Sequence, residues 1–372
     1  MKIQRAEVFP TRLPFRKTFK ISRGAVGSPQ EGAPHVFVRL TADDGTEGWG
    51  EARPSHRWSY ETEESVVSTL RNYLAPLCIG LDCFEIQRLH EQMERQIAPG
   101  TTIGQPIAKS ALDMAFHDIA CRASGVSLCE FLGSAPIPLR LAYIVSAENP
   151  EEAAEATRAG AKLGHTAFKI KLGLNPDLDP QIVAAVKEAA PGGFLWADAN
   201  QAYTPSQAAR LGRALASEGA AVLEQPLPAN DWTGLRQLRS ASALPIAVDE
   251  SAFSPRDLIQ LIKLEAADCV VVKVAKSGGL RPARLAIEIA REAGLEILGS
   301  GLTESGLGFA ASAHLYAAYH VEVVDLNGPQ FLADDPLRSR VRIEAGKAFP
   351  AQAPGFGIEM DLEKLSRFEV KS

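Results

Sequence analysis

Three acidic residues stand at the ends of three successive apolar segments, a placement that suits metal binding. They are Asp198, Glu224 and Asp249. Carboxylates held close together repel one another unless a cation neutralises them. An all-oxygen ligand set suits Mg²⁺ or Mn²⁺ better than zinc, and three monodentate carboxylates leave positions for water and a substrate carboxylate. The alternative, in which each acid only caps the helix that follows it, leaves the recurrence in three consecutive segments unexplained.

Lysines flank these acids along the chain. Lys169 and Lys171 alternate with apolar residues, so both are expected to face the same way, inward. Lys273 interrupts an apolar run, where a charged side chain needs a partner or a task; the alternative is that the lysines reach solvent. Positive charge from Lys171 and a metal would lower the pKa of Lys169 and make it a base. These residues suit removal of a proton next to a carboxylate, with the metal stabilising the enediolate.

Two further features are less specific. Glu304 either hydrogen-bonds Lys273 or simply lies in a loop. The segment 276–279, Lys-Ser-Gly-Gly, follows the Lys273 strand and suits anion binding, but it does not match a P-loop. We find no serine–histidine–aspartate triad in the sequence.

The spacing of the strand-end residues predicts the elements that position them. The polar residues recur every 24 to 29 positions, which accommodates one strand, one helix and two short loops. Counting the strands before and after them gives eight βα units, the pattern of a (β/α)₈ barrel; a doubly wound sheet would not place polar residues at one end of six consecutive strands. Pro336 and charged residues interrupt the eighth helix, so the fold class predicted is a (β/α)₇β TIM-type barrel. The recurring residues are Lys169, Asp198, Glu224, Asp249, Lys273 and Ser300.

The residues before the barrel have a different pattern, which predicts an α+β capping domain over 1–133. An alternating segment at 36–41 runs into the turn 43–45, and three segments with helical apolar spacing follow. The polar stretches 17–33 and 52–60 are predicted to be loops. We assign 134–330 to the barrel and 331–372 to a segment that returns to the cap and completes it.

Composition limits the class of protein. The 372 residues are 46% hydrophobic, which permits a sizeable core, and the net charge of −6 disfavours nucleic-acid and anionic-membrane partners. No apolar run approaches the roughly 20 residues of a membrane span, and the N-terminus lacks a signal-peptide pattern. Five cysteines without CxxC spacing suggest reduced, buried thiols. We therefore expect a cytoplasmic protein that acts on a small molecule.

These motifs resemble the enolase superfamily, specifically its muconate lactonizing enzyme subgroup within the mandelate racemase/muconate lactonizing enzyme family. The resemblance rests on the Lys-x-Lys pair at 169 and 171, the three-acid series, and the segment Lys-Val-Ala-Lys-Ser-Gly-Gly-Leu that begins at Lys273. It covers the whole chain, since the family has an α+β cap on a (β/α)₇β barrel. A lysine at 273 separates the chain from mandelate racemases, which use a His–Asp pair instead.

The resemblance implies roles for these residues. Asp198, Glu224 and Asp249 would bind Mg²⁺ or Mn²⁺, Lys169 and Lys273 would be the acid/base pair, and Lys171 would tune Lys169. The protein would be an isomerase or lyase acting on a carboxylate substrate through an enediolate, and family members are commonly homo-oligomers.

The same resemblance leaves the substrate open. Segments 275–280 and 302–308 favour a muconate cycloisomerase-like activity; the alternative is a racemase or epimerase of an amino-acid derivative or dipeptide. Asp325-Leu326-Asn327 resembles the Asp-x-Asp with which dipeptide epimerases hold an ammonium group, but its second aspartate is asparagine. Specificity would come from cap loops around 20–34 and 54–60. The second loop carries the candidate substrate contacts His56, Arg57, Trp58 and Tyr60.

Two other classes of function fit less of the sequence. A Schiff-base aldolase using Lys171 or Lys273 leaves the three acids without a role. A non-catalytic barrel retained as a binding protein leaves the complete set of lysines and acids without one.

Overall fold

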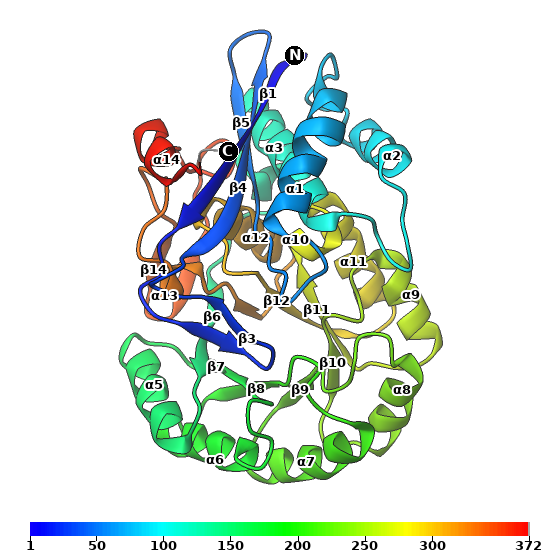
Figure 1. Cartoon of the computed structure of the whole chain (residues 1–372), viewed down its shortest axis with the longest axis vertical. Coiled ribbons are helices and arrows are strands. Elements are labelled where there is room, and N and C mark those ends of the chain that lie inside the picture. The colour runs from blue at the N-terminus through cyan, green and yellow to red at the C-terminus, as the bar shows by residue number, and fades with distance from the viewer. Residues whose placement is uncertain (371–372) are drawn as a thin grey trace.

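Eight parallel strands close into a barrel, in a computed structural model that describes residues 1–370. Each strand pairs with the next along the chain, and β13 closes the ring by pairing with β6 (Figure 1). This confirms the predicted TIM-type barrel. The strands are β6 (Leu139–Ser146), β7 (Ala167–Lys171), β8 (Phe194–Asp198), β9 (Val222–Glu224), β10 (Ile246–Val248), β11 (Cys269–Lys273), β12 (Glu296–Ser300) and β13 (Val323–Asp325).

A helix follows each of the first seven barrel strands and covers its outer face. Asn149, Thr204 and Ser254 cap three of these helices with their side chains, as their positions before proline predict. After β13 the chain forms only the four-residue α13 (Gly328–Phe331), so the eighth helix is missing. The seven are α5 (Pro150–Lys162), α6 (Asp179–Ala189), α7 (Pro205–Ser217), α8 (Trp232–Ala241), α9 (Pro255–Lys263), α11 (Leu280–Glu292) and α12 (Gly306–Ala318).

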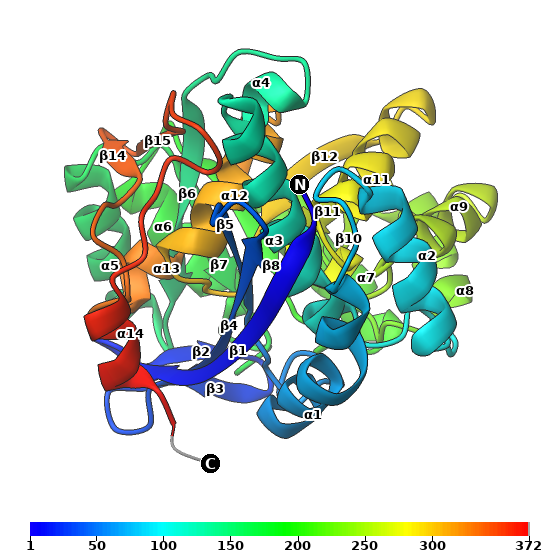
Figure 2. The same ribbon diagram turned by 90° about the horizontal axis from the view of Figure 1, so that it is seen from above.

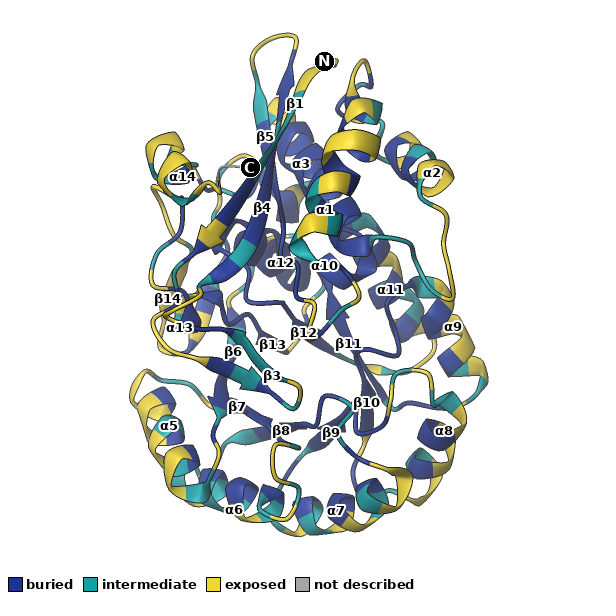
Figure 3. Ribbon diagram, in the orientation of Figure 1, coloured by how far each residue is buried: buried dark blue, intermediate teal, exposed yellow. Residues whose placement is uncertain are grey.

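The inside of the barrel is a packed core beneath the polar strand ends. Alternate residues of each strand face inward and form a small apolar cluster that includes Ala167, Trp196, Val222 and Val271. The other face of each strand packs on the helices, whose outer surfaces are exposed (Figure 3). Inward-facing residues at the carboxyl ends of the strands therefore lie next to one another on top of this apolar cluster.

The cap is a three-stranded antiparallel sheet, ordered β1–β4–β5, with a buried helix across it. Gly48 and Gly50 on β5 let α3 approach closely, because a Cβ at either position would overlap the α3 backbone at Ala115 or Ala111. The elements are β1 (Ile3–Leu13), β4 (Ala33–Ala42), β5 (Glu47–Ala52), α1 (Glu63–Thr69), η1 (Leu70–Leu74), η2 (Ala75–Cys78), α2 (Ile86–Gln96), α3 (Pro106–Ser124) and α4 (Leu128–Phe131).

The segment 17–33, predicted to be a loop, contains a short hairpin of β2 (Phe19–Ile21) and β3 (Gly24–Gly27). Gly24 has a φ of 107° at the turn, a conformation that most side chains disfavour. The prediction missed the hairpin because each strand has only three or four residues. The hairpin extends from the cap toward the barrel (Figure 1).

The last part of the chain contacts both barrel and cap. The hairpin of β14 (Arg342–Glu344) and β15 (Lys347–Phe349) pairs with β6. The helix α14 (Leu362–Phe368) then packs near β1, and the N–H of Val370 donates to the carbonyl of Pro10 (Figure 2).

Buried carboxylates join cap and barrel. Glu51 on β5 accepts hydrogen bonds from the N–H groups of Ser305 and Gly308 at the start of α12. Asp113 on α3 accepts one from the N–H of Leu280 at the start of α11. Both contacts place negative charge at a helix N-terminus, where it is favourable. The cap therefore contacts the N-termini of the barrel helices α11 and α12.

All five cysteines are buried and unpaired, as predicted. Within residues 1–370, no helix combines the length and apolar character that crossing a membrane requires.

Candidate active site

The structure brings the predicted acids and lysines together at the carboxyl end of the barrel, beneath the cap. Parallel pairing aligns Lys171 with Asp198 and Asp198 with Glu224 on adjacent strands. Asp249 follows β10 directly, and Lys273 ends β11. All of these side chains are buried, so their charges interact through protein and not through bulk water.

Lys169 lies at the centre of the carboxylates. Its Nζ is 2.9 Å from Glu224 Oε2 and 3.2 Å from both Asp198 Oδ2 and Asp325 Oδ2, and it stands 4.2 Å above the centre of the Trp196 ring. Burial by itself lowers the pKa of Lys169, but the facing carboxylates outweigh it and hold that pKa well above its usual value.

The other lysines pair with one carboxylate each. Lys171 Nζ is 2.5 Å from Asp198 Oδ2. Lys273 Nζ is 2.6 Å from Asp249 Oδ2 and 4.0 Å from the centre of the Trp58 ring. Burial lowers the pKa of Lys273, but the charge of Asp249 raises it by a larger amount, so the pKa lies above its usual value.

Lys276 is a charged group of the site that the sequence did not assign to it. Its Nζ donates to Asp249 Oδ1 at 2.7 Å and to the Asp249 carbonyl at 2.6 Å. Burial lowers the pKa of Lys276 despite this carboxylate. The sequence contained evidence for this placement. Lys273 and Lys276 are three positions apart at the start of the helical turn α10 (Val274–Ser277), and that spacing places two side chains on the same face of a helix.

The acids fit a divalent cation by their chemistry. Glu224 Oε2 forms no hydrogen bond of acceptable geometry, and burial together with Asp198 raises the pKa of Glu224 well above its usual value. Glu250 Oε2 also lacks a partner, and burial followed by Asp249 raises the pKa of Glu250 to about 7. Such carboxylate repulsion is what a bound Mg²⁺ or Mn²⁺ relieves.

The acids are not yet arranged around one point. Within residues 1–370, no three His, Cys, Asp or Glu side chains form a group that could hold a metal ion as they stand. Instead Lys169 and Lys273 neutralise the carboxylates directly. Asp198, Glu224 and Asp249 are the residues that could hold the metal.

Glu304 lies in the loop between β12 and α12, the second of the two alternatives for it, and Asp325 ends β13. Glu304 is buried and accepts a hydrogen bond from the N–H of Leu302 at 2.7 Å. Burial and Glu51 raise the pKa of Glu304 to about 7, and within the described chain it forms neither a hydrogen bond nor an ion pair with Lys273. Asp325, considered only as an ammonium-binding residue, pairs with Lys169 and accepts a hydrogen bond from Asn327 Nδ2 at 3.0 Å.

The cap closes over these groups. The β2–β3 hairpin contributes Phe19, Ile21 and Val26 to a cavity of about 30 Å³, and the second loop contributes Ser55 and Trp58. Substrate entry therefore requires the hairpin or the loop to move.

Of the four predicted contacts in the second loop, only Trp58 lines this cavity. His56 and Arg57 are exposed. Tyr60 is 51% exposed and donates its hydroxyl proton to the carbonyl of Ile103.

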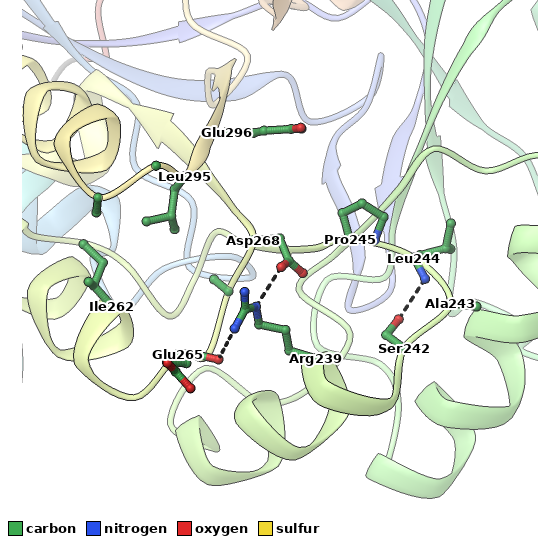
Figure 4. A pocket seen from close by; sticks show the side chains of 13 residues that line it. Arg239, Ser242, Ala243, Leu244, Pro245, Ile262, Glu265, Asp268, Leu295 and Glu296 are labelled. Atoms are coloured by element: carbon green, nitrogen blue, oxygen red, sulfur yellow. Dashed lines mark hydrogen bonds and ion pairs between the residues drawn. The ribbon is translucent and has the colours of Figure 1, made fainter.

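A larger hollow lies at the opposite end of the barrel, and no such cluster lines it (Figure 4). Arg239 there pairs with Asp268 at 2.7 Å and donates to the carbonyl of Glu265 at 3.2 Å. The Asp268 carboxylate also accepts the N–H of Ile246. These groups satisfy one another, so the small cavity under the cap, and not this larger hollow, carries the chemistry.

Comparison with known proteins identifies the family of the chain. The family described as "Mandelate racemase / muconate lactonizing enzyme, N-terminal domain" matches residues 4–133, and "Enolase C-terminal domain-like" matches residues 151–365. An N-succinyl-L-Arg/Lys racemase of Bacillus cereus is 29% identical over 100% of this chain and 98% of its own length. Its crystal structure superposes with a TM-score of 0.94 and covers 100% of this chain and 99% of that one.

Relatives with other activities are similarly close. Muconate cycloisomerase 1-2 of Acinetobacter lwoffii is 32% identical over 89% of this chain and 87% of its own length. The structure of a dipeptide epimerase from Enterococcus faecalis, complexed with Mg and L-Leu-L-Tyr, is 29% identical with a TM-score of 0.90, over 96% of this chain and 100% of that one. These relatives share the fold but act on different substrates.

Proposed function

The chain belongs to the mandelate racemase/muconate lactonizing enzyme family of the enolase superfamily and is an isomerase, and from that premise we propose that it is a racemase or epimerase. The reaction would move a proton at a carbon next to a carboxylate, with Mg²⁺ or Mn²⁺ as cofactor. The substrate would be an amino-acid derivative whose amino group is not a free ammonium.

The positions of two lysines around the barrel carry this proposal. Lys169 is on β7 and Lys273 on β11, four strands apart in a ring of eight, so they approach the centre from opposite sides. Inversion at carbon needs a base on one face and an acid on the other. Cycloisomerisation delivers one proton to one face, so it leaves the second lysine without a required proton transfer.

Each residue of the cluster has a task in this reaction. Asp198, Glu224 and Asp249 would hold the cation, which when bound stabilises negative charge on the substrate carboxylate. Lys169 takes the proton from one enantiomer while Lys273 supplies one to the opposite face, and the roles reverse for the other enantiomer.

The aromatic side chains support the same groups. The ring centre of Trp196 lies 4.2 Å from Lys169 Nζ, and that of Trp58 lies 4.0 Å from Lys273 Nζ. Their apolar rings cover one side of each lysine, which helps to exclude water from the reacting atoms.

The cavity lining supports a substrate without a free ammonium group. Asn327 Oδ1 and the Trp58 indole N–H are buried, belong to residues that line the cavity, and have no hydrogen-bond partner among residues 1–370. Asn327 is neutral, so its oxygen suits an amide N–H better than a cation, and Trp58 suits a carbonyl oxygen. Both groups match an N-acylated amino acid, whose amide offers one donor and one acceptor.

A second candidate is muconate cycloisomerisation. It is supported by the segments 275–280 and 302–308 and by the relative from Acinetobacter lwoffii. A diacid also has no ammonium, so the neutral Asn327 does not separate these two candidates. They differ in the bond that forms, which an experiment can detect.

The deciding experiment incubates the Mg²⁺- or Mn²⁺-loaded protein in D₂O with N-acyl amino acids, dipeptides and cis,cis-muconate. We expect proton NMR to show deuterium at the α-carbon of an N-acyl amino acid, with loss of optical rotation. Formation of a lactone from muconate without α-exchange of any amino-acid derivative would support the second candidate and contradict the first.

Single-lysine variants then test the two-base geometry. With Lys169→Ala or Lys273→Ala, racemisation should fall below detection, while each variant should still exchange the α-proton of the one enantiomer that faces its remaining lysine. Exchange of both enantiomers by one variant would contradict the assignment of one lysine to each face.

A further inference from the structure

A second hollow lies outside the barrel, at the seam where β13 meets β6 and the eighth helix is missing. It has a volume of about 350 Å³, within the range of small-molecule sites and much larger than the cavity under the cap. The elements α5, β6, α13 and β14 lie together on this side of the molecule in both views (Figures 1 and 2). Without an eighth helix, the outward face of β6 is open to a ligand.

The walls of the hollow are apolar and partly exposed. Tyr143 on the outward face of β6 and Leu326 after β13 contribute buried surface. Leu163 and Ile343 contribute exposed surface, with 61% and 38% of their side chains accessible. Exposed apolar side chains beside a hollow favour a ligand with an apolar body.

Two cations lie at the hollow without an acidic partner. Arg16 and Lys17 line it, and none of the described residues that line it is acidic. Neither cation forms an ion pair within 4.0 Å in the part of the chain that the structure describes. Unpaired positive charge beside an apolar wall is complementary to a small organic anion.

Both cations are held in place. Arg16 donates from Nε at 2.9 Å and from Nη2 at 2.6 Å to the carbonyl of Leu332, which fixes the guanidinium. Lys17 Nζ lies 5.5 Å from the centre of the Tyr143 ring and 4.9 Å from that of Phe331. Partial burial against these rings, and then Arg16, lowers the pKa of Lys17, consistent with an ammonium that lacks a counter-ion.

We propose that this hollow is a binding site for a small organic carboxylate with an apolar or aromatic body. The carboxylate pairs with Arg16 and Lys17, and the body packs on Tyr143, Leu326 and Leu163. The hollow and the cavity under the cap share only Asn327, and the residues that would bind the carboxylate, Arg16 and Lys17, line the hollow and not the cavity.

The site can influence the cap. Phe331, which contacts the Lys17 ammonium, also stacks on Phe19 with ring centres 4.3 Å apart. Phe19 belongs to the hairpin that covers the catalytic groups. A carboxylate bound to Lys17 therefore lies one aromatic contact away from the hairpin.

Benzoate is a suitable probe, with benzamide as a neutral molecule of the same shape. Binding to the full-length protein is followed through the methyl resonances of Leu163 and Ile343, which report on the hollow and not on the cap. We expect saturable shifts with benzoate, and none with benzamide or with inorganic phosphate, which lacks an apolar body.

Variants separate this site from nonspecific charge. Lys17→Gln should weaken benzoate binding about tenfold, since a hydrogen bond to a charged group contributes on that order. Lys162→Gln removes an exposed lysine from the neighbouring α5 and should change nothing. Leu163→Glu places a negative charge, of the same sign as benzoate, on the apolar wall and should abolish the shifts of the Ile343 methyl groups. Because Leu163 is exposed, the substitution should not unfold the chain.

Equal benzoate affinity in the wild type and Lys17→Gln, or shifts of equal size with benzamide, would overturn the proposal. So would a saturable benzoate effect on methyl groups under the cap alone. A crystal structure with benzoate between Arg16 and Tyr143 would establish it directly.

Discussion

Replacement of Glu51 by glutamine tests how the cap is held to the barrel. The Glu51 carboxylate is fully buried and accepts four hydrogen bonds: from His35 Nδ1 at 2.6 Å, Ser305 N at 2.8 Å, Ser305 Oγ at 2.6 Å and Gly308 N at 2.9 Å. Three of these donors, Ser305 N, Ser305 Oγ and Gly308 N, are at the start of α12. Glutamine has the same shape, so the substitution changes charge and hydrogen bonding with little change of volume.

The expected loss is large for a single isosteric change. The NH₂ group of a glutamine at this position would face N–H and O–H groups that are themselves donors. The substitution also removes the negative charge from the N-terminus of α12. Leaving buried donors without their acceptor costs about 1–3 kcal/mol in the free energy of unfolding. We therefore expect Glu51→Gln to unfold at a clearly lower urea concentration than the wild type.

Glu47→Gln on the same strand is the matched control. Glu47 is partly exposed and lies 3.3 Å from Arg39, so its loss should change the free energy of unfolding by less than about 1 kcal/mol. Urea unfolding followed by tryptophan fluorescence measures both variants. A loss below about 1 kcal/mol for Glu51→Gln, or an equal loss for Glu47→Gln, would refute the assigned role of the buried carboxylate.

The pH dependence supplies a second test. Burial raises the pKa of Glu51, but hydrogen bonds from His35 and Ser305 lower it by a larger amount. The pKa of Glu51 in the folded state therefore lies below the ordinary value of 4.5. The folded state then binds fewer protons at Glu51 than the unfolded state does. The contribution of Glu51 to the free energy of unfolding is complete above about pH 4.5 and is lost as the pH falls through the pKa of the folded state. The difference between the wild type and Glu51→Gln should shrink below that pH and stay constant above it.

Three further predictions concern the site and the cap. Lys273→Ala should abolish isomerase activity while Mn²⁺ affinity, measured by titration calorimetry, stays within a few-fold, because Lys273 is not a proposed ligand; an active variant would contradict the two-base mechanism. Removing divalent cations with EDTA should abolish activity, and Mg²⁺ at 100 times its Kd should raise the free energy of unfolding by about 2.7 kcal/mol. Glu224→Gln should lose most of that stabilisation, and retention of it would exclude Glu224 as a ligand. Gly50→Ala should destabilise the cap by about 1–3 kcal/mol in thermal unfolding, since its Cβ overlaps the carbonyl of Ala111, whereas Gly100→Ala has open space and should be neutral.

The residues at strand ends were predictable because they repeat. Asp198, Glu224 and Asp249 recur at nearly constant spacing, and in parallel strands that spacing places them at one end of the sheet. Asp325 had only a motif resemblance, and its contact with Lys169 follows from closure of the barrel between β13 and β6. The count of eight units predicts that the last strand closes on the first, but no local pattern predicts that Asp325 then contacts Lys169.

Contacts from the cap were the least predictable part of the site. Trp58 lies over Lys273 although the two residues are far apart in sequence, while its neighbours His56 and Arg57 face solvent. A polar loop has no periodicity that separates inward from outward residues, so its orientation depends on the surface it packs against.

The (β/α)₇β barrel, the cap and the candidate acids and lysines could be predicted from the chain, because period and strand-end position are local properties of a sequence. The three-dimensional contacts were needed to show that Lys169 and Lys273 face each other across the barrel and pair with carboxylates. They also revealed Lys276 on Asp249 and the open seam beside β6. Those outcomes depend on distances between segments remote in the chain, which are set by closure of the ring and by docking of the cap.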